Sequence, residues 1–157
     1  MRRLQTTLVL AVACTLPRAA LATSYVVNTI EVMGVAETNL GDAIASQICQ
    51  DLSASLKDAR VLCPADIKAM LQARADALSL GVDSAIESTG DLVDAKRGIS
   101  GSLASIERRA VLQLSLLDLA HGKVLARSSV TVPAGDLRGI LKGASRALVE
   151  LFESLER

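Results

Sequence analysis

Residues 110–133 read AVLQLSLLDLAHGKVLARSSVTVP, and this stretch decides the fold class. Apolar residues recur at almost every second position in 110–118 and again in 123–132. This period of two predicts two strands, each with one face on a core and the other toward water or a partner. Gly122 lies in the turn between them, and Pro133 ends the second strand. The stretch therefore predicts an antiparallel hairpin.

The segments around this hairpin extend the pattern. Residues 98–106 also read as a strand, so three consecutive strands with short connections predict a meander. Two earlier strands are expected at 25–35 and 59–63. Three helices are predicted by apolar stripes at spacings of three and four residues. The stripes are Ile44, Ile48, Leu52 and Leu56; then Ile67, Met70, Leu71, Ala75 and Leu78; then Leu137, Ile140, Leu141, Ala144, Leu148, Leu151, Phe152 and Leu155.

These elements predict an α+β domain with the order β-α-β-α-(α)-β-β-β-α. Helices that each carry one apolar stripe must cover a sheet, so we expect a two-layer sandwich. Its mixed sheet has about five strands, ends in the meander and carries three to four helices. The bracketed helix is a short one that a capping box at 88–91 predicts through Lys96. It lies in the acidic, irregular segment 79–98, which is a candidate contact loop or a plain surface loop.

Composition narrows the function. The chain has 157 residues, half of them apolar, with 17 Lys and Arg against 17 Asp and Glu. This is a one-domain, globular composition without the basic excess of a nucleic-acid-binding face. There is no Trp, and Tyr25 and Phe152 are the only other large aromatic residues. Platforms that stack bases or sugars need several such side chains, so those classes are not expected.

The first 22 residues read as a secretory signal peptide. A basic start at Arg2 and Arg3 precedes an apolar run that is too short to span a bilayer. A small-residue site then predicts cleavage between Ala22 and Thr23. The mature domain is expected to be residues 23–157, without a membrane span and located in the periplasm or secreted. Cys14 loosely resembles the cysteine of a lipoprotein box, so a lipid-anchored form is the alternative.

Removal of the signal also changes the charge. It takes three of the 17 basic residues, namely Arg2, Arg3 and Arg18, and leaves 14 against 17 acidic residues. A mildly acidic domain is repelled by nucleic acid and by anionic lipid. We therefore expect no nucleic acid among the partners.

Two cysteines remain after the signal, Cys49 and Cys63. Export to an oxidising compartment permits a disulfide between them, which would close a short loop. The other reading is two unpaired cysteines, with Cys49 a small buried residue of a helix and Cys63 the end of a strand. The sequence leaves both readings open, and Cys49 and Cys63 are the candidate pair for a disulfide.

Catalytic and metal-binding patterns are weak. Ser100 lies in GISGS, which lacks the second glycine of a nucleophile elbow and stands inside a strand. His121 is the only histidine and is expected in a solvated turn. A zinc site would have to gather it with both cysteines from three separate elements. The acidic residues of segment 79–98 lack the spacing of a calcium loop. No catalytic residue, metal ligand or cofactor is therefore assigned.

Several loose motifs resemble one known family. They are IEVMGV at 30–35, LGDAIA at 40–45, RVLCPADI at 60–67, ISGSL at 99–103 and LSLLDLAHGKVLA at 114–126. Together they resemble the amino-terminal domain of the periplasmic Tol-system translocation protein and the related curli-assembly lipoprotein domain. The resemblance implies an anticodon-binding-like sandwich and a non-catalytic envelope module that docks other proteins. It carries over no functional residue.

The leading hypothesis is thus an exported protein–protein interaction module. Its physical basis is a meander whose exposed strands can accept a partner strand or helix. The alternatives are a small hydrolase, which would need Ser100 and His121 to converge, and a self-assembling structural subunit or lipoprotein of an envelope complex.

Overall fold

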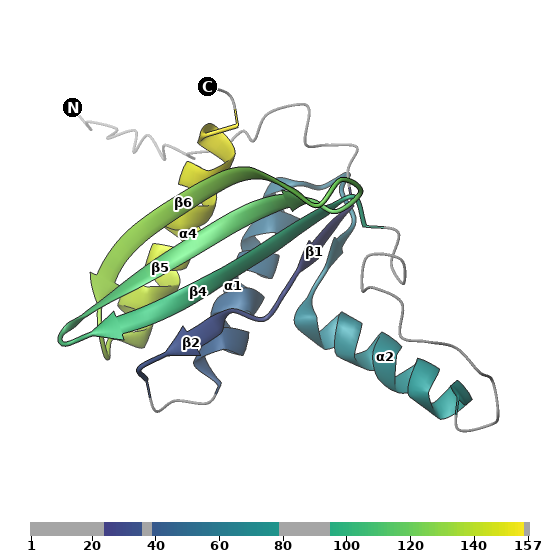
Figure 1. The fold of residues 1–157 in the computed structure, drawn as a ribbon, viewed down its shortest axis with the longest axis horizontal. Helices are drawn as coiled ribbons and strands as arrows, with labels where there is room; N and C mark the ends of the chain where they lie inside the picture. Colours follow the sequence, from purple (N-terminus) through teal and green to yellow (C-terminus); the bar gives the residue numbers. More distant parts are fainter. Residues whose placement is uncertain (1–23, 36–38, 79–94, 156–157) are drawn as a thin grey trace, which may run out of the picture.

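The computed structural model describes residues 24–35, 39–78 and 95–155, which form one sheet and three helices (Figure 1). The elements are β1 (Tyr25–Val27), β2 (Glu31–Met33), α1 (Leu40–Ser55), β3 (Val61–Leu62), α2 (Pro64–Leu78), β4 (Arg97–Ile106), β5 (Arg109–Asp118), β6 (Lys123–Pro133) and α4 (Leu137–Glu153). The predicted α+β two-layer sandwich is confirmed. Residues 79–94, which include most of the candidate contact loop and of the short helix, lie outside the described residues.

The sheet is mixed and has six strands in the described residues. Its order is β3-β1-β4-β5-β6. β2 pairs with the same edge of β4 as β1 does, but farther toward the end of β4. The pairs among β1, β2, β3 and β4 are parallel. β4, β5 and β6 form the predicted antiparallel meander. Parallel strands need long crossover connections, and α1 and α2 lie in those connections.

The single strand expected at 25–35 is divided into β1 and β2, which is why the sheet has six strands and not five. Val27 pairs with Ile99, whereas Glu31 pairs with Ser102. The first segment therefore advances four residues while β4 advances three, so it holds one extra residue, as at a β-bulge. Ile30 lies in this break and turns its side chain into the core.

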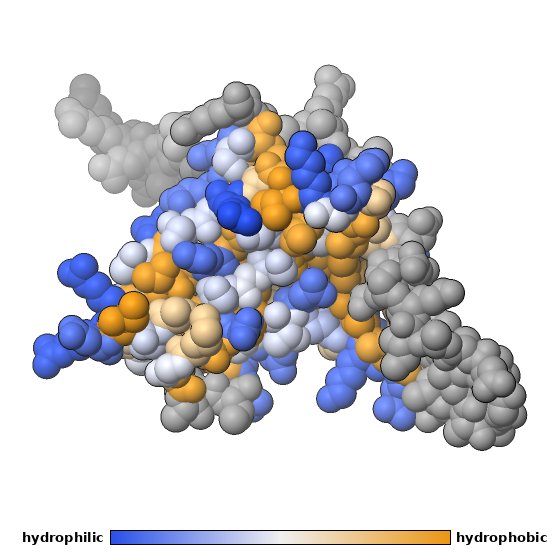
Figure 2. Space-filling view, viewed as in Figure 1, coloured by the Kyte–Doolittle hydropathy of each residue, from blue (hydrophilic) through white to orange (hydrophobic). Residues whose placement is uncertain are grey.

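The two faces of the sheet differ. In Figure 2 the sheet is seen from the side opposite α1 and α4, and pale and blue residues cover much of its centre. We call this side the open face. Register places Ser100, Ser102, Gln113, Ser115, Arg127, Ser129 and Thr131 on it. The polar positions of the alternating pattern thus point away from the helices, as predicted.

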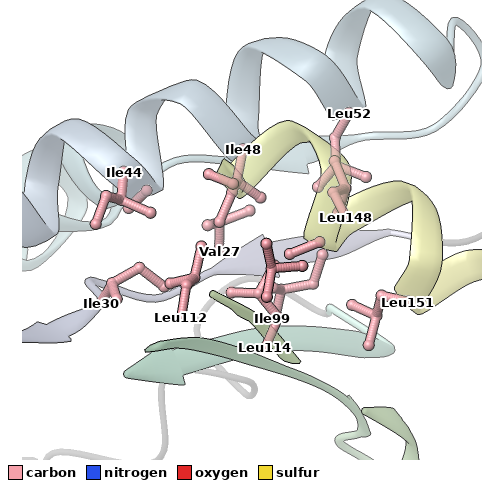
Figure 3. Close-up of a cluster of buried hydrophobic side chains, with 14 of the residues drawn as sticks. Val27, Ile30, Ile44, Ile48, Leu52, Ile99, Leu112, Leu114, Leu148 and Leu151 are labelled. Carbon is pink, nitrogen blue, oxygen red and sulfur yellow. The ribbon is translucent and has the colours of Figure 1, made fainter. Parts of the chain in front are cut away.

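The core fills the space between the sheet and the helices α1 and α4 (Figure 3). Ile44, Ile48 and Leu52 of α1 point down onto it, and Leu148 and Leu151 of α4 meet them from the side. Fourfold spacing places the α1 residues on one face of the helix. The predicted stripes of both helices are confirmed, except that Leu137 is exposed at the start of α4.

The helix α2 departs from the prediction. Its stripe was expected to be buried, but Ile67 and Met70 are only partly buried and Leu71 is exposed. Only the first part of α2 reaches the sheet, where it packs on a small cluster with Val26 and Leu62. The helix then runs away from the sheet (Figure 1). A stripe of apolar residues predicts which side of a helix can be buried, but it does not predict along how many turns another element covers that side.

Candidate interaction surface

The open face is built by three rows of residues that cross the meander. Each row takes one residue from β4, one from β5 and one from β6, because residues at matched register share a face. The rows are Ser100, Ser115 and Arg127; Ser102, Gln113 and Ser129; and Ala104, Val111 and Thr131. Glu31 and Met33 of β2 extend the second and third rows. The face therefore changes from polar to apolar along β4.

The middle of the open face is polar and shallow. A hollow of about 520 Å³ lies over β5 and β6, with Gln113, Ser115, Arg127 and Ser129 in its lining. Hydroxyl, amide and guanidinium groups on a flat sheet can hydrogen-bond the backbone or side chains of a docked segment. This region offers polar contacts and no enclosed cavity.

The end of the face at the β4–β5 hairpin is more apolar. The side chain of Ile106 is 68% exposed and that of Met33 is 48% exposed. A hollow of about 840 Å³ adjoins Ile106, and Glu107, Arg108, Arg109, Val111 and Thr131 are in its lining. Orange residues gather at this end, at the lower left of Figure 2. Large exposed apolar side chains beside arginines are typical of interaction sites.

Sequence reasoning did not single out Ile106 or Met33. A signal was present for Ile106, because a period of two continued from Ser100 and Ser102 places it on the open face. For Met33 there was no such signal. Its face depends on the extra residue between Val27 and Glu31, and that break appears only in the paired structure.

The opposite end of the open face is covered. Val26 of β1 and Leu62 of β3 form a small apolar cluster there, against Ile67 and Met70 of α2 and Leu119 of the β5–β6 turn. Gly98 lies under Leu119, and a Cβ atom at Gly98 would come within 3.0 Å of that side chain. The exposed part of the face therefore runs from its polar middle to the β4–β5 hairpin.

The edge strand β6 is a second exposed feature. No strand pairs with its outer side among the described residues. Lys123 and Arg127 are its charged residues, and the run from Ser128 to Val132 is uncharged and rich in β-branched residues. A sheet edge of this kind is a template for a partner strand. The predicted meander therefore has both a free face and a free edge.

The β5–β6 turn holds His121 as expected, in an exposed position. The ring nitrogen Nδ1 of His121 lies 2.9 Å from Oδ2 of Asp118. This hydrogen bond lowers the pKa of the Asp118 carboxyl below its ordinary value. The Asp118 carboxylate also accepts hydrogen bonds from the backbone N–H groups of Ala120 and His121. These contacts are sufficient to explain both side chains as parts of a turn.

The structure does not bring Ser100 and His121 together. Ser100 faces Ser115 in the middle of the sheet, while His121 lies beyond the pair formed by Asp118 and Arg97. Three residues of strand separate Ser100 from that pair, a distance of roughly 10 Å. A nucleophile and its base must lie within hydrogen-bond reach. The hydrolase hypothesis therefore has no Ser–His pair in these residues.

The two cysteines do come together. Cys49 of α1 and Cys63, directly before α2, stand in disulfide geometry with their Cα atoms 5.8 Å apart. Asp66 of the first turn of α2 accepts a hydrogen bond of 3.0 Å from the backbone N–H of Cys63. Both contacts fix the beginning of α2. Within the described residues, no three His, Cys, Asp or Glu side chains gather where they could hold a metal ion.

The expected cleavage site between Ala22 and Thr23, and the alternative lipid site at Cys14, lie outside the described residues. No helix in 24–35, 39–78 and 95–155 has both the length and the apolar character needed to cross a bilayer.

This chain is similar to known proteins in structure but not in sequence. No protein-family model matches the chain, and no curated protein matches its sequence. The PelC L103M dodecamer from Paraburkholderia phytofirmans has a TM-score of 0.54 at 17% identity, covering 90% of this chain and 93% of that one. Lipoprotein GNA1162 from Neisseria meningitidis has a TM-score of 0.52 at 16% identity, covering 82% and 96%.

The LpoB C-terminal domain from Escherichia coli has a TM-score of 0.51 at 13% identity, covering 72% of this chain and 84% of that one. TolB from Acinetobacter baumannii also resembles the chain, with a TM-score of 0.45 at 11% identity, covering 83% and 28%. The LpoB and GNA1162 structures confirm the predicted resemblance to Tol-related envelope domains, and at these identities it is a resemblance of fold.

Proposed function

We propose that this chain is an exported, non-catalytic module of the cell envelope that binds another protein. Its fold is shared by GNA1162, which is a lipoprotein, and by the LpoB domain. Catalysis is left out of the proposal because Ser100 and His121 lie on separate elements.

The open face is the single observation that carries this proposal. Three long strands present a surface that α1 and α4 leave uncovered, and its polar middle passes into exposed apolar residues at the β4–β5 hairpin. Exposed apolar side chains provide contact area for a docked protein, and neighbouring polar groups can hydrogen-bond it. Ile106 and Met33 give this face its exposed apolar contact area at the hairpin end.

Photo-crosslinking in the expressing cells tests this proposal. A photoreactive amino acid is placed at Gln113 or Ser129 on the open face, and at Ser46 or Gln50 on α1 as the control. We expect a discrete protein adduct from the open-face positions and none from the α1 positions. Adducts of equal yield from both faces, or no adduct at either, would contradict the proposal.

Export belongs to the same proposal. Residues 1–22 act as a signal peptide that is cleaved between Ala22 and Thr23, and the mature domain resides in the periplasm or is secreted. The alternative is cleavage before Cys14 with a lipid on its thiol. The intact mass of the chain from the envelope fraction distinguishes these forms, and an unprocessed chain in the cytosol would refute both.

A second candidate function is self-assembly into a structural subunit. The observation that favours it is that PelC, whose fold is similar over 90% of this chain, was solved as a dodecamer. The free edge of β6 gives a second copy a strand to pair with. Light scattering on the purified mature chain at micromolar concentration would give a multiple of the protomer mass if this is right, and a monomer mass if it is wrong.

A further inference from the structure

The β4–β5 hairpin presents a small apolar surface flanked by positive charge. We define the hairpin-end patch by Met33, Ile106, Arg108, Arg109 and Val111. Ile106, Arg109 and Val111 lie on the open face by register, and Met33 is in the row of Val111. Ile106 and Met33 are exposed, and Val111 is half-buried.

The turn that carries the patch is tight. Ile106 pairs directly with Arg109, so Glu107 and Arg108 form a two-residue connection. Glu107 has a φ of 57°, the left-handed conformation that such hairpin turns require and that glycine adopts more easily. Ladder pairs on both sides of the turn hold the patch in place, which reduces the entropy that a partner must remove on binding.

The charges of the patch are unbalanced. Arg108 and Arg109 form no ion pair among the described residues, and neither guanidinium lies within 4.0 Å of the Glu107 carboxylate. Glu107 offsets one of the two positive charges, so the turn keeps a net positive charge beside an exposed isoleucine. An arginine fork binds a carboxylate in a directed way, so its natural complement is an Asp or Glu side chain.

We infer that the hairpin-end patch binds a segment of a partner protein that carries a large apolar residue next to an acidic one. This inference rests on the proposed function and names the chemistry of its partner. The apolar residue packs on Ile106, Met33 and Val111, while the carboxylate pairs with Arg109 or Arg108. Apolar contact supplies affinity, and the charge pair supplies orientation and selectivity.

A library of random twelve-residue peptides displayed on phage provides the probe. It is selected against the chain purified from the envelope of the cells that express it. We expect the enriched peptides to share an Asp or Glu within a few positions of Leu, Ile or Phe. A library that yields no binders, or binders without acidic residues, overturns the inference.

The consensus peptide then reports on the individual residues. Ile106→Asp and Arg109→Glu should each weaken its binding about tenfold or more. Leu137→Asp and Arg138→Glu make the same changes at exposed positions of α4, behind the sheet, and should leave the affinity unchanged. Equal affinity for the patch variants and the parent chain would refute the site.

A charge swap separates recognition from loss of fold. A peptide with Lys in place of the acidic residue should bind the Arg109→Glu variant more tightly than the consensus peptide does. If the swap restores nothing, the charge part of the inference is wrong. The result is independent of the crosslinking at Gln113 and Ser129. A partner crosslinked there that ignores the patch variants would refute this inference and leave the proposed function intact.

Discussion

Ser145 of α4 donates a hydrogen bond of 2.6 Å from its Oγ to Oδ2 of Asp51 on α1. The other oxygen of Asp51 accepts a hydrogen bond of 3.0 Å from the Nε2 of Gln47, one turn earlier on the same helix. Asp51 is half-buried, so this pair of contacts replaces part of its lost hydration. It is a polar tie between two helices that otherwise meet through apolar side chains.

Ser145→Ala should therefore lower the free energy of unfolding by about 1–2 kcal/mol, because hydrogen bonds to a charged group contribute more than neutral ones. Denaturant unfolding followed by circular dichroism measures the difference. Ser46→Ala makes the same change at an exposed position of α1 and should cost nothing. An equal effect at both positions would show that the tie to Asp51 does not contribute.

Gly41→Ala should destabilise the protein by about 1–3 kcal/mol, although alanine is the better helix former. A Cβ atom at Gly41 would overlap the backbone carbonyl oxygen of Ile30, which cannot move without disturbing the sheet. The matched change is Gly139→Ala in α4, where the Cβ would meet only the side chain of Asp136. That variant should be neutral or more stable in thermal unfolding, and the opposite ranking would contradict the packing described here.

Reduction of the Cys49–Cys63 disulfide should lower the free energy of unfolding by about 3 kcal/mol, since it frees a loop of about 15 residues in the unfolded chain. Unfolding with and without dithiothreitol measures this effect. The variant with Cys49→Ala and Cys63→Ser should unfold alike in both conditions. Free thiols in the chain isolated from the envelope, detected by mass spectrometry after alkylation, would show that the bond does not form.

Tyr25→Phe should leave the protein as stable at neutral pH or more stable by about 1 kcal/mol. The ring of Tyr25 packs 6.0 Å from that of Phe152, and its hydroxyl is buried without a hydrogen-bond partner in the described part of the chain. Replacing Tyr25 with Phe therefore removes the free-energy cost of burying a hydroxyl that has no hydrogen-bond partner. A loss of more than 1 kcal/mol in denaturant unfolding would mean that the hydroxyl does bind a partner.

The same residue predicts a pH dependence. Burial raises the pKa of Tyr25 above its ordinary value of 10.0. Above pH 10 the unfolded state then loses the phenol proton before the folded state does, so stability falls as the pH rises. The fall should be smaller in Tyr25→Phe. Because the chain has one tyrosine, ultraviolet absorbance follows its ionisation directly, and a midpoint at or below 10 would contradict the burial.

The parts of the fold that follow from local pattern were predictable from the sequence. Strand alternation in 110–132 and the fourfold spacing of Ile44, Ile48 and Leu52 fix which side chains face the core, and the structure agrees. The break between β1 and β2 was not predictable. It arises because Ile30 turns into the core and lies against Gly41, a contact between segments that a one-dimensional pattern does not contain.

The candidate surface was predictable only in part. Polar residues such as Gln113 and Ser129 indicated a face that contacts solvent or a partner. An isoleucine in a strand, such as Ile106, is equally typical of a core position. Ile106 is exposed because its register places it on the open face, which α1 and α4 do not cover, and α2 covers only the opposite end of that face. How far one element covers another depends on tertiary packing, which the sequence pattern does not contain. For the same reason, the predicted burial of the apolar stripe of α2 was too high.

The sheet topology has a consequence for the order in which the chain can fold. β4, β5, β6 and α4 follow one another directly, so their contacts close short stretches of chain and cost little entropy. β1 and β3 are synthesised earlier, yet the strand that joins β1 to the rest of the sheet is β4. Synthesis from the N-terminus thus delivers β4, β5 and β6 after β1 and β3, and the first half of the chain has to remain unaggregated until then.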